Sequence, residues 1–288
     1  MKVVGLGSAG CKIAKAFAKF PQYDAIGIDT QSEATITIKE RSSHEEYDAH
    51  FPNIKRKLKF SNEDVLVITS GSGKISGGIL RLLEQIQNNR ISVLYLQSDL
   101  SLMSATQKMQ DRVVKNVLQE YARSGVLEVI YLVDETYVNR SLGDMSIIGY
   151  YDTLNQAIVN TLHTVNVFKH TEPIIGNFIN PRSVSRIATI GVLLLPDEED
   201  NAPQEENWFY DLTSVQDVVY YYGINEEDLK NDGTLFRRIT QFVKSKAEEN
   251  VNVSYGVFKT TYEQKYCYCI KYSSVVQSYT ELDDQDIG

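Results

Sequence analysis

The sequence Gly5-Leu6-Gly7-Ser8-Ala9-Gly10 follows the apolar start Met1-Lys2-Val3-Val4 and precedes a run of helical character from Cys11 to Phe20. This order predicts a tight turn from a strand into a helix. Glycine lets backbone N–H groups approach an anion closely, and a helix N-terminus adds partial positive charge at the same point. With Asp29 at the end of the next expected strand, the stretch also fits a dinucleotide-binding fingerprint in which the acid binds a ribose.

A second glycine-rich stretch, Ser70-Gly71-Ser72-Gly73-Lys74-Ile75-Ser76-Gly77-Gly78, stands between the apolar run Val65 to Ile68 and the helical run Ile79 to Ile86. It is not a P-loop, because Ile68 stands where the first glycine belongs and Ile75 where Ser or Thr would hold magnesium. A dehydrogenase needs no second turn of this kind. Small residues that merely permit a tight turn are the alternative. Two turns closing on one phosphate chain predict a nucleotide site.

The composition is that of a globular protein and limits its partners. The 288 residues are 42% hydrophobic and 23% charged, and the net charge of -9 argues against a dedicated nucleic-acid binder. No apolar run is long enough to span a bilayer, and the first one is of strand length, so we expect no signal peptide. The three cysteines are an odd number, which argues against a disulfide framework and favours a reducing cytoplasm.

The first half of the chain alternates strands with helices, which predicts a parallel sheet covered on both faces. The expected strands are Val3-Val4, Ala25 to Ile28, Val65 to Ile68, Val93 to Leu96 and Val129 to Val133. Ser104 to Ser124 is expected to be a helix whose apolar stripe comprises Met109, Val113, Val114, Val117, Leu118 and Tyr121. The polar stretch Asp29 to Phe60 is expected to form loops and short elements.

The second half begins with a long helix expected from Ile148 to His170, after which the composition changes. We expect a strand at Ile187 to Leu195 and an acidic surface loop at Asp197 to Asn207. Helices are expected at Val215 to Tyr222 and Leu235 to Glu249, and two antiparallel strands at Val251 to Lys259 and Tyr266 to Tyr272. Cys267 and Cys269 alternate on one strand face, which favours burial in a core over a metal site.

The order of these features resembles that of the tubulin/FtsZ superfamily. Val65 to Gly78 aligns without gaps on the family's strand and glycine-rich signature, and Gly5 to Cys11 is similar to its first phosphate loop. Ile28 to Gln31 resembles the Asn-Thr-Asp segment after the second strand. Leu154-Asn155-Gln156 stands at the start of the long helix, where the family has an Asn that binds guanine. The small size suggests a divergent phage- or plasmid-type FtsZ/TubZ-like protein.

The resemblance implies a fold and its division. It implies an α/β protein with a parallel Rossmann-like nucleotide-binding sheet, a long central helix and a smaller α+β domain. The expected segments are a nucleotide-binding domain at 1–147, the central helix at 148–170, an activation-like domain at 171–278 and an acidic tail at 279–288.

The resemblance also implies a guanine-nucleotide site, with GTP and a possible Mg2+ as cofactors. The residues implied for the α- and β-phosphates are Gly5, Gly7, Ser8, Ala9, Gly10 and Cys11, and those for the β- and γ-phosphates are Ser72, Gly73, Lys74, Ile75 and Ser76. Asp29 and Lys108 would lie near the ribose, and Asn155 near the base. The alternative is that Lys74 and Lys108 are solvated and that Asn155 is a capping or surface residue.

The catalytic loop departs from the family pattern. Relatives hydrolyse GTP when a second subunit inserts Asn-x-Asp-x-x-Asp, whose acids polarise the attacking water. Here Asn177 remains, but Ile179 and Arg182 replace the acids, and neither can act as a base. Ser104 stands where many relatives have a Glu, and Glu172 is a candidate substitute acid. The sequence therefore predicts weak or absent hydrolysis.

The predicted function is that of a cytoplasmic protein, in a bacterial host if phage-encoded, that assembles head to tail with copies of itself. Such filaments position or segregate phage or plasmid DNA, often through an adaptor protein, without direct contact with nucleic acid or membrane. One alternative is a degenerate binding or structural module without nucleotide chemistry. The other alternative is a Rossmann NAD(P)-dependent oxidoreductase. Against it, this sequence has no Tyr-x-x-x-Lys at the expected helical position.

Overall fold

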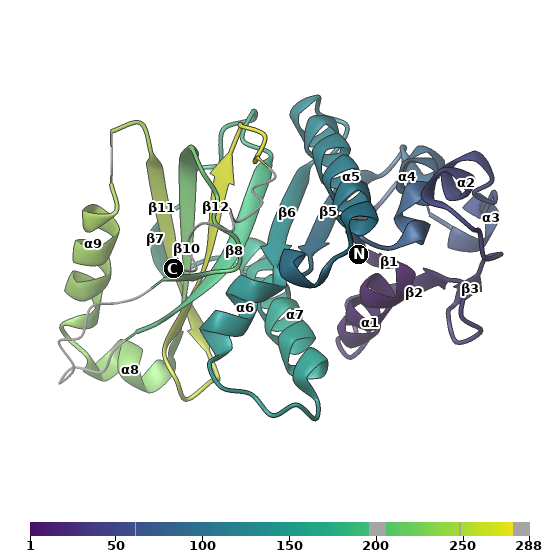
Figure 1. The fold of residues 1–288 in the computed structure, drawn as a ribbon. Helices are drawn as coiled ribbons and strands as arrows, with labels where there is room; N and C mark the ends of the chain where they lie inside the picture. Colours follow the sequence, from purple (N-terminus) through teal and green to yellow (C-terminus); the bar gives the residue numbers. More distant parts are fainter. Residues whose placement is uncertain (61, 196–205, 248, 279–288) are drawn as a thin grey trace, which may run out of the picture. The chain divides into compact units, whose positions relative to one another are not determined.

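The structure is a computed structural model in which residues 1–60, 62–195, 206–247 and 249–278 are described (Figure 1). Contacts within the chain divide it into two compact units. The first comprises Met1–Thr136 together with the segment that starts at Val275, and the second comprises Tyr137–Ser274. The long helix expected at 148–170 therefore belongs to the second unit.

The first unit contains a fully parallel sheet with the strand order β3-β2-β1-β4-β5-β6. The strands are β1 (Lys2–Leu6), β2 (Asp24–Asp29), β3 (Ile36–Thr37), β4 (Asp64–Ser70), β5 (Arg90–Gln97) and β6 (Val129–Asp134). The predicted parallel sheet is thereby confirmed. From β1 to β3 successive strands are added on one side of the sheet, and from β4 to β6 they are added on the other, so the strand order switches between β1 and β4. Ligands of such sheets bind at the carboxyl ends of the strands beside this switch point.

Helices cover both faces of this sheet, with α1 on one side and α4 and α5 on the other (Figure 1). The helical elements of this unit are α1 (Gly7–Phe17), α2 (His44–Ala49), α3 (Lys55–Leu58), the 3-10 helix η1 (Lys74–Gly78), α4 (Ile79–Ile86), η2 (Leu100–Leu102) and α5 (Ala105–Arg123). The helix α6 (Glu135–Leu142) begins in this unit, but its residues from Tyr137 on belong to the second. The stretch from Asp29 to Phe60 forms short elements, as predicted. Because both faces are covered, the core strands read as continuous apolar runs: all five residues from Val65 to Thr69 are buried.

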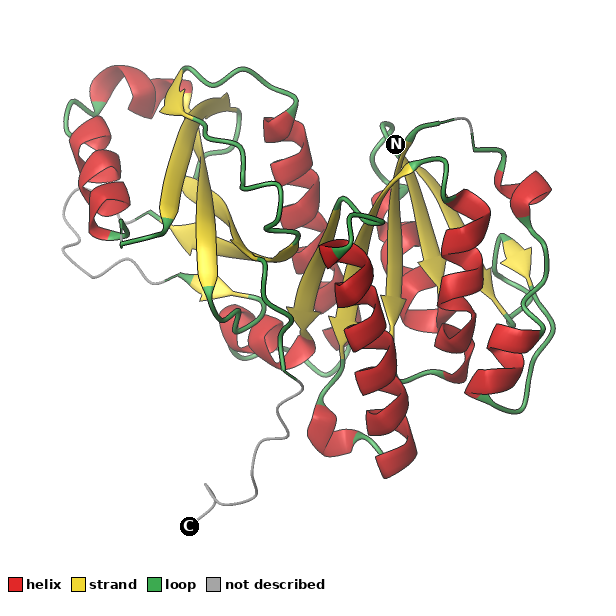
Figure 2. Ribbon diagram, turned by 90° about the horizontal axis from the view of Figure 1, so that it is seen from above, coloured by secondary structure: helices red, strands yellow, loops and turns green. Residues whose placement is uncertain are grey.

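The second unit contains a mixed sheet with the strand order β8-β12-β10-β11-β7, with β9 pairing on β8. Its elements are α7 (Tyr150–Lys169), β7 (Ile175–Asn177), β8 (Ile187–Leu194), β9 (Asn207–Trp208), β10 (Val215–Asn225), α8 (Glu226–Asn231), α9 (Leu235–Ser245), β11 (Asn252–Thr260) and β12 (Tyr266–Ser273). Figure 2 shows strands and helices of both units in contrasting colours.

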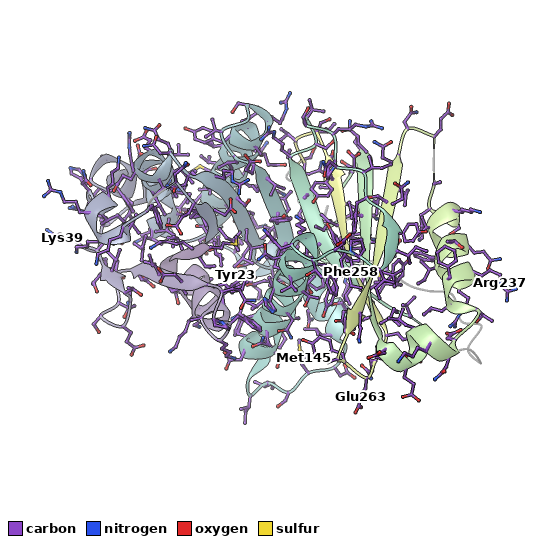
Figure 3. All side chains as sticks on the ribbon, turned by 180° about the vertical axis from the view of Figure 1, so that it is seen from behind. Tyr23, Lys39, Met145, Arg237, Phe258 and Glu263 are labelled. Carbon is purple, nitrogen blue, oxygen red and sulfur yellow. The ribbon has the colours of Figure 1, made fainter. Side chains whose placement is uncertain are left out.

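Aromatic side chains hold α7 and α9 on opposite faces of the second sheet. On one face, Phe168 of α7 stacks on Phe258 with ring centroids 4.3 Å apart. On the other, Ile239 of α9 packs in a buried cluster with Tyr220 and Tyr222. Figure 3 shows Phe258 inside this layer and Arg237 of α9 at the surface. The predicted long helix is confirmed with its buried stripe, which includes Leu154, Ile158, Leu162, Val165 and Phe168.

Two predictions for the second half were wrong. Val215 to Tyr222 is strand β10 rather than a helix: its apolar residues satisfy helical spacing, but the strand is central, and helices on both faces bury eight consecutive residues. The strands β11 and β12 exist but do not pair with each other, because β10 lies between them, parallel to β11 and antiparallel to β12.

Other boundaries differ less. The helix expected at Leu235 to Glu249 ends at Ser245, and the strand expected from Ile187 ends at Leu194. The acidic loop expected at Asp197 to Asn207 lies outside the described residues up to position 205, and the tail at 279–288 lies wholly outside them. Cys267 and Cys269 are both buried on the face of α9, as their alternation predicted. In the described part of the chain, no helix combines the length and apolarity needed to cross a membrane.

Candidate functional site

The first glycine stretch is the first turn of α1 itself, because the helix begins at Gly7 and not at Cys11 as expected. Gly7 has φ +77°, which favours glycine. A Cβ on Gly5 would lie 2.2 Å from the Gly10 carbonyl oxygen, and a Cβ on Gly10 would lie 2.4 Å from that of Ile68. Gly5 and Gly10 therefore allow α1 to lie directly against β1 and β4.

The N-terminus of α1 has no side-chain cap. The first N–H groups of a helix have no acceptor within the helix, and an uncapped N-terminus is an anion-binding feature. Ser8 is exposed and Ala9 is half-buried in this first turn, whereas Gly5, Gly7 and Gly10 are buried. Of the six residues predicted for the α- and β-phosphates, Ser8 is exposed, and Ala9 and Cys11 are half-buried.

Cys11, the sixth of these residues, faces the sheet. Its thiol lies 3.6 Å from the carbonyl oxygens of both Gly5 and Ile28. Burial, and then the negative charge of Asp29, raise the pKa of the Cys11 thiol to about 11. Asp29 is 8% exposed and accepts a hydrogen bond from the Thr30 backbone N–H at 2.7 Å. Cys11 and Asp29 thus lie together at the carboxyl ends of β1 and β2, with the thiol in its neutral form.

The second glycine stretch forms η1, and most of its glycines serve packing. A Cβ on Gly71 would lie 2.3 Å from the Tyr95 hydroxyl oxygen, one on Gly77 2.0 Å from the His44 carbonyl oxygen, and one on Gly78 2.2 Å from the Phe51 ring. Gly73 differs, since its nearest such contact is the Ile75 Cγ2 atom at 4.0 Å. Of the glycines in this turn, Gly73 is therefore the one that lies next to open space.

The polar residues of the second turn divide into internal and outward-facing side chains. The Ser76 hydroxyl is directed at the carbonyl oxygens of Gly73, at 2.6 Å, and Gly71, at 2.8 Å, so it holds the turn rather than a ligand. Lys74 is exposed and Ser72 is half-buried. The N-terminus of η1 at Gly73 has no side-chain cap.

The two turns meet. The Ile75 Cγ2 atom lies 2.8 Å from the position that a Cβ on Gly7 would occupy. The uncapped N-termini of α1 and η1 are therefore in contact through Gly7 and Ile75. These helices follow β1 and β4, the two neighbouring strands between which the strand order switches. The sequence predicted that the turns would face one site, but it gave no signal that an isoleucine methyl group would lie against the first turn.

The third part of this region is α5, whose start has an internal role. Ser104 caps α5 and forms a capping box with Gln107, so the residue that replaces the family's Glu stabilises the helix end. Lys108, predicted near the ribose, lies one turn further on and is half-buried.

The buried face of α5 differs from the predicted stripe. Met109 and Val113 are 59% and 51% exposed, whereas Asp111, Lys115 and Gln119 are at most 1% exposed. Their spacing of four residues was the available signal, and it indicated a polar face that is normally solvated.

These polar side chains form a hydrogen-bonded network at the carboxyl ends of β5 and β6. The Tyr95 hydroxyl donates to Asp111 Oδ1 at 2.5 Å. The Lys115 ammonium donates to Gln97 Oε1 at 2.9 Å, and Gln97 Nε2 donates to Asp134 Oδ2 at 2.8 Å. Burial lowers the pKa of Lys115 to about 8 and raises that of Asp134.

The remaining predicted residues lie in the second unit. Asn155 is half-buried in the first half of α7. Asn177 ends the edge strand β7, pairs with Tyr255 of β11 and is exposed, as is Ile179. The Arg182 guanidinium lies 3.9 Å from Asp217 and donates to the Asn250 carbonyl oxygen at 2.9 Å. Glu172, the candidate substitute acid, is exposed just after α7.

Solved structures resemble this chain along almost its whole length. The FtsZ dimer of M. jannaschii matches with a TM-score of 0.68 at 12% identity, over 94% of this chain and 87% of that one. GDP-form protofilaments of TubZ from Bacillus thuringiensis serovar israelensis match with a TM-score of 0.69 at 16% identity, over 96% and 87%. The chain has the tubulin/FtsZ fold. A GTPγS-bound protofilament of CetZ2 from Haloferax volcanii matches equally well, with a TM-score of 0.69 at 16% identity over 96% and 94%.

The sequence itself matches no protein-family model and no curated protein. The tubulin/FtsZ fold is therefore recognised through the arrangement of its elements, as the order of the motifs predicted. Within that fold, the first unit brings Gly7, Ser8, Gly73, Lys74 and Ile75 to one edge of the parallel sheet. Among the described residues, no group of three His, Cys, Asp or Glu side chains lies ready to hold a metal ion.

Proposed function

We propose that this chain is a tubulin/FtsZ-like nucleotide-binding protein that assembles head to tail with copies of itself. The observation that carries the proposal is the contact between two uncapped helical starts at the carboxyl ends of β1 and β4. Backbone N–H groups at two adjoining turns suit a chain of phosphates, since each turn adds donors and partial positive charge.

The residues present fit a nucleoside triphosphate in part. In this proposal the first turn of α1 binds the α- and β-phosphates through backbone N–H groups near Ser8 and Ala9. The open side of Gly73 and the exposed ammonium of Lys74 bind the β- and γ-phosphates. Ser76 supports the turn from inside, and Ile75 narrows the space beside Gly7. The ligand is GTP, with Asp29 and Lys108 toward the ribose and Asn155 toward the base.

The proposed assembly places the loop from Asn177 to Arg182 against the nucleotide of the next subunit. This loop presents exposed Asn177 and Ile179, while Arg182 is bound to Asp217 and Asn250 of its own unit. An isoleucine and a paired guanidinium cannot accept a proton from water, so hydrolysis is weak or absent. In this proposal a nucleotide holds the filament together rather than timing its disassembly.

The TubZ and CetZ2 structures that share this fold are protofilaments, which supports self-association as the arrangement to test. The proposal includes the segment boundaries expected from the sequence, at 1–147, 148–170, 171–278 and 279–288. It also includes a cytoplasmic location for the filament and an adaptor protein that links the filament to phage or plasmid DNA. The net charge of -9 favours an adaptor over direct contact with nucleic acid.

Sedimentation and electron microscopy test the assembly, with no nucleotide, with GTP and with a slowly hydrolysed GTP analogue. We expect pelletable filaments with both nucleotides and none without. A phosphate-release assay across a protein concentration series is expected to give slow turnover, and brisk, cooperative turnover would overturn the prediction of weak hydrolysis. Absence of both nucleotide binding and filaments would overturn the proposed function and favour the degenerate module.

A further inference from the structure

A groove of about 620 Å³ opens in the second unit, and none of the glycine-turn residues lines it. It lies on the sheet face that α9 covers, beside the start of β10 and the last turn of α9. Its lining includes Arg182, Glu206, Tyr220, Lys246, Asn250 and Lys271. Its volume lies within the range of small-molecule sites, and its walls carry more cations than carboxylates.

The carboxylate of Glu206 is fully engaged within the groove. One oxygen accepts from the Tyr220 hydroxyl at 2.5 Å, and the other accepts from the Lys246 ammonium at 2.7 Å. Although burial acts to raise the pKa of Glu206, these hydrogen bonds hold it below its usual range. Glu206 therefore stays ionised and forms an ion pair with Lys246.

Lys271 packs against an aromatic ring and, among the described residues, has no carboxylate at ion-pair distance. Its ammonium lies 4.1 Å from the centroid of the Trp208 ring, a cation–π contact. In the described part of the chain it forms no ion pair. Burial is the largest influence on the pKa of Lys271 and lowers it. The charge of Lys246 acts in the same direction, while the charges of Glu206 and Asp211 act to raise it. A cation removed from water is stabilised by an anion placed against it.

The rest of the wall combines donors suited to an oxyanion with one further carboxylate, the exposed Glu249. Ser214, Gln216 and Asn250 line the same space with hydroxyl and amide groups. Lys271 also lines an adjoining hollow of about 250 Å³ together with Arg140, Trp208 and the carboxylates of Glu206 and Asp211. An ammonium that faces both hollows, with hydroxyl and amide donors beside it, fits a ligand with more than one oxyanion group.

We propose that this groove binds a small polyanion bearing phosphate or carboxylate groups, with Lys271 as its principal contact. The site does not depend on the nucleotide proposal, because it lies in the other unit and uses none of the glycine-turn residues. Phosphate and carboxylate ligands share the chemistry of an oxyanion on an ammonium, and the probes below distinguish them.

The chain carries its own reporter, since Trp208 is its single tryptophan. We would titrate the full-length protein separately with pyrophosphate and with citrate, at constant ionic strength kept by sodium chloride, and follow tryptophan fluorescence. A saturable change is expected with at least one probe. Saturation with pyrophosphate alone would identify a phosphate ligand, and saturation with citrate alone a carboxylate ligand.

Variants assign the change to Lys271. Lys271→Met is expected to weaken the probe's affinity at least tenfold, whereas Lys271→Arg keeps the charge and retains binding. Lys244→Met changes an exposed lysine of α9 outside the groove and serves as the matched control. Because Lys271→Met alters the surroundings of Trp208, calorimetry with the same probe gives a second measurement.

Heat from pyrophosphate at the glycine turns would persist in Lys271→Met, while the heat from the groove would disappear. No saturable fluorescence change in the wild-type protein, or equal affinity in the wild type and Lys271→Met, would overturn the proposal.

Discussion

Gly7 carries two constraints at once, and each has its own physical origin. Its φ of +77° is costly for any residue with a Cβ, and the Ile75 methyl group leaves no room for one. Gly143 has a similar φ of +68° but has nothing within 4 Å of its hypothetical Cβ. Comparing substitutions at Gly7 and Gly143 therefore distinguishes the cost of backbone strain from the cost of a steric clash.

We therefore expect Gly143→Ala to cost about 1 kcal/mol and Gly7→Ala to cost about 1–2 kcal/mol more. Urea unfolding followed by circular dichroism measures both. Combining Gly7→Ala with Ile75→Ala should recover part of the loss, because the methyl group that clashes is gone. Equal costs for the two glycine variants would show that Ile75 does not press on the first turn.

Glu135 predicts a pH dependence of stability. Burial, and then repulsion from Asp134, raise the pKa of Glu135 from its ordinary value of 4.5 to about 6. Between these values the folded state binds more protons than the unfolded state, so stability from this group falls as pH rises through the window. Glu135→Gln should match the wild type near pH 4 and exceed it above pH 6 by about 1 kcal/mol. The exposed Glu128→Gln should leave the profile unchanged; a flat difference for Glu135→Gln would refute the prediction.

At the scale of elements, α5 has its polar side inward. Asp111, Lys115 and Gln119 face the sheet and the segment after Val275, where Gln119 and the Gln277 backbone exchange two hydrogen bonds of 2.7 and 3.2 Å. Buried polar groups of this kind are stable only when they are hydrogen-bonded to one another. The network therefore fixes the rotation of α5 about its axis, and Met109 and Val113 are exposed as a result.

Lys115→Met tests this network. Removing the cation leaves the Gln97 amide oxygen without its donor and the Asp111 and Asp134 charges uncompensated. We expect a loss of about 3–5 kcal/mol in the free energy of unfolding. Arg112→Met changes an exposed cation on the same helix and should stay within about 0.5 kcal/mol of the wild type. Comparable stability of the two variants would mean that Lys115 contributes no pairing.

At the scale of the whole molecule, the proposed filament makes catalysis a property of two chains. The sequence comparison predicts that Ile179 replaces the first acid of the tubulin/FtsZ pattern. Ile179 is 46% exposed, so a polar replacement should not disturb folding. In the proposed filament, Ile179→Asp would place a carboxylate on the loop that faces the next subunit's nucleotide.

We expect Ile179→Asp to raise GTP turnover at least tenfold in the assembled protein, within the range of general-base contributions. Phosphate release measured above and below the assembly concentration checks this. Ile174→Asp, 60% exposed in the same segment but outside the motif, is the matched control. Turnover that rises equally in both variants, or in neither, would argue against this loop position.

Local patterns were enough to predict the parallel sheet, the long helix α7 and the two glycine turns. Apolar periodicity and glycine punctuation are written into neighbouring residues, and in these segments nothing distant opposes them. The same patterns misled at β10, where Val and Tyr residues at helical spacing lie in a central strand. Burial on both faces removes the alternation that identifies a strand, and only the neighbouring strands and helices supply that burial.

By itself, then, the sequence determined the tubulin/FtsZ order of elements and the positions of both glycine turns. Only the tertiary structure decided that Gly71, Gly77 and Gly78 serve packing, that Ile75 lies against Gly7, and that α5 buries Asp111 and Lys115. It also decided that Lys246 and Lys271 meet across one groove. The physical reason is that these facts depend on close approach between segments far apart in the chain, which no local spacing encodes.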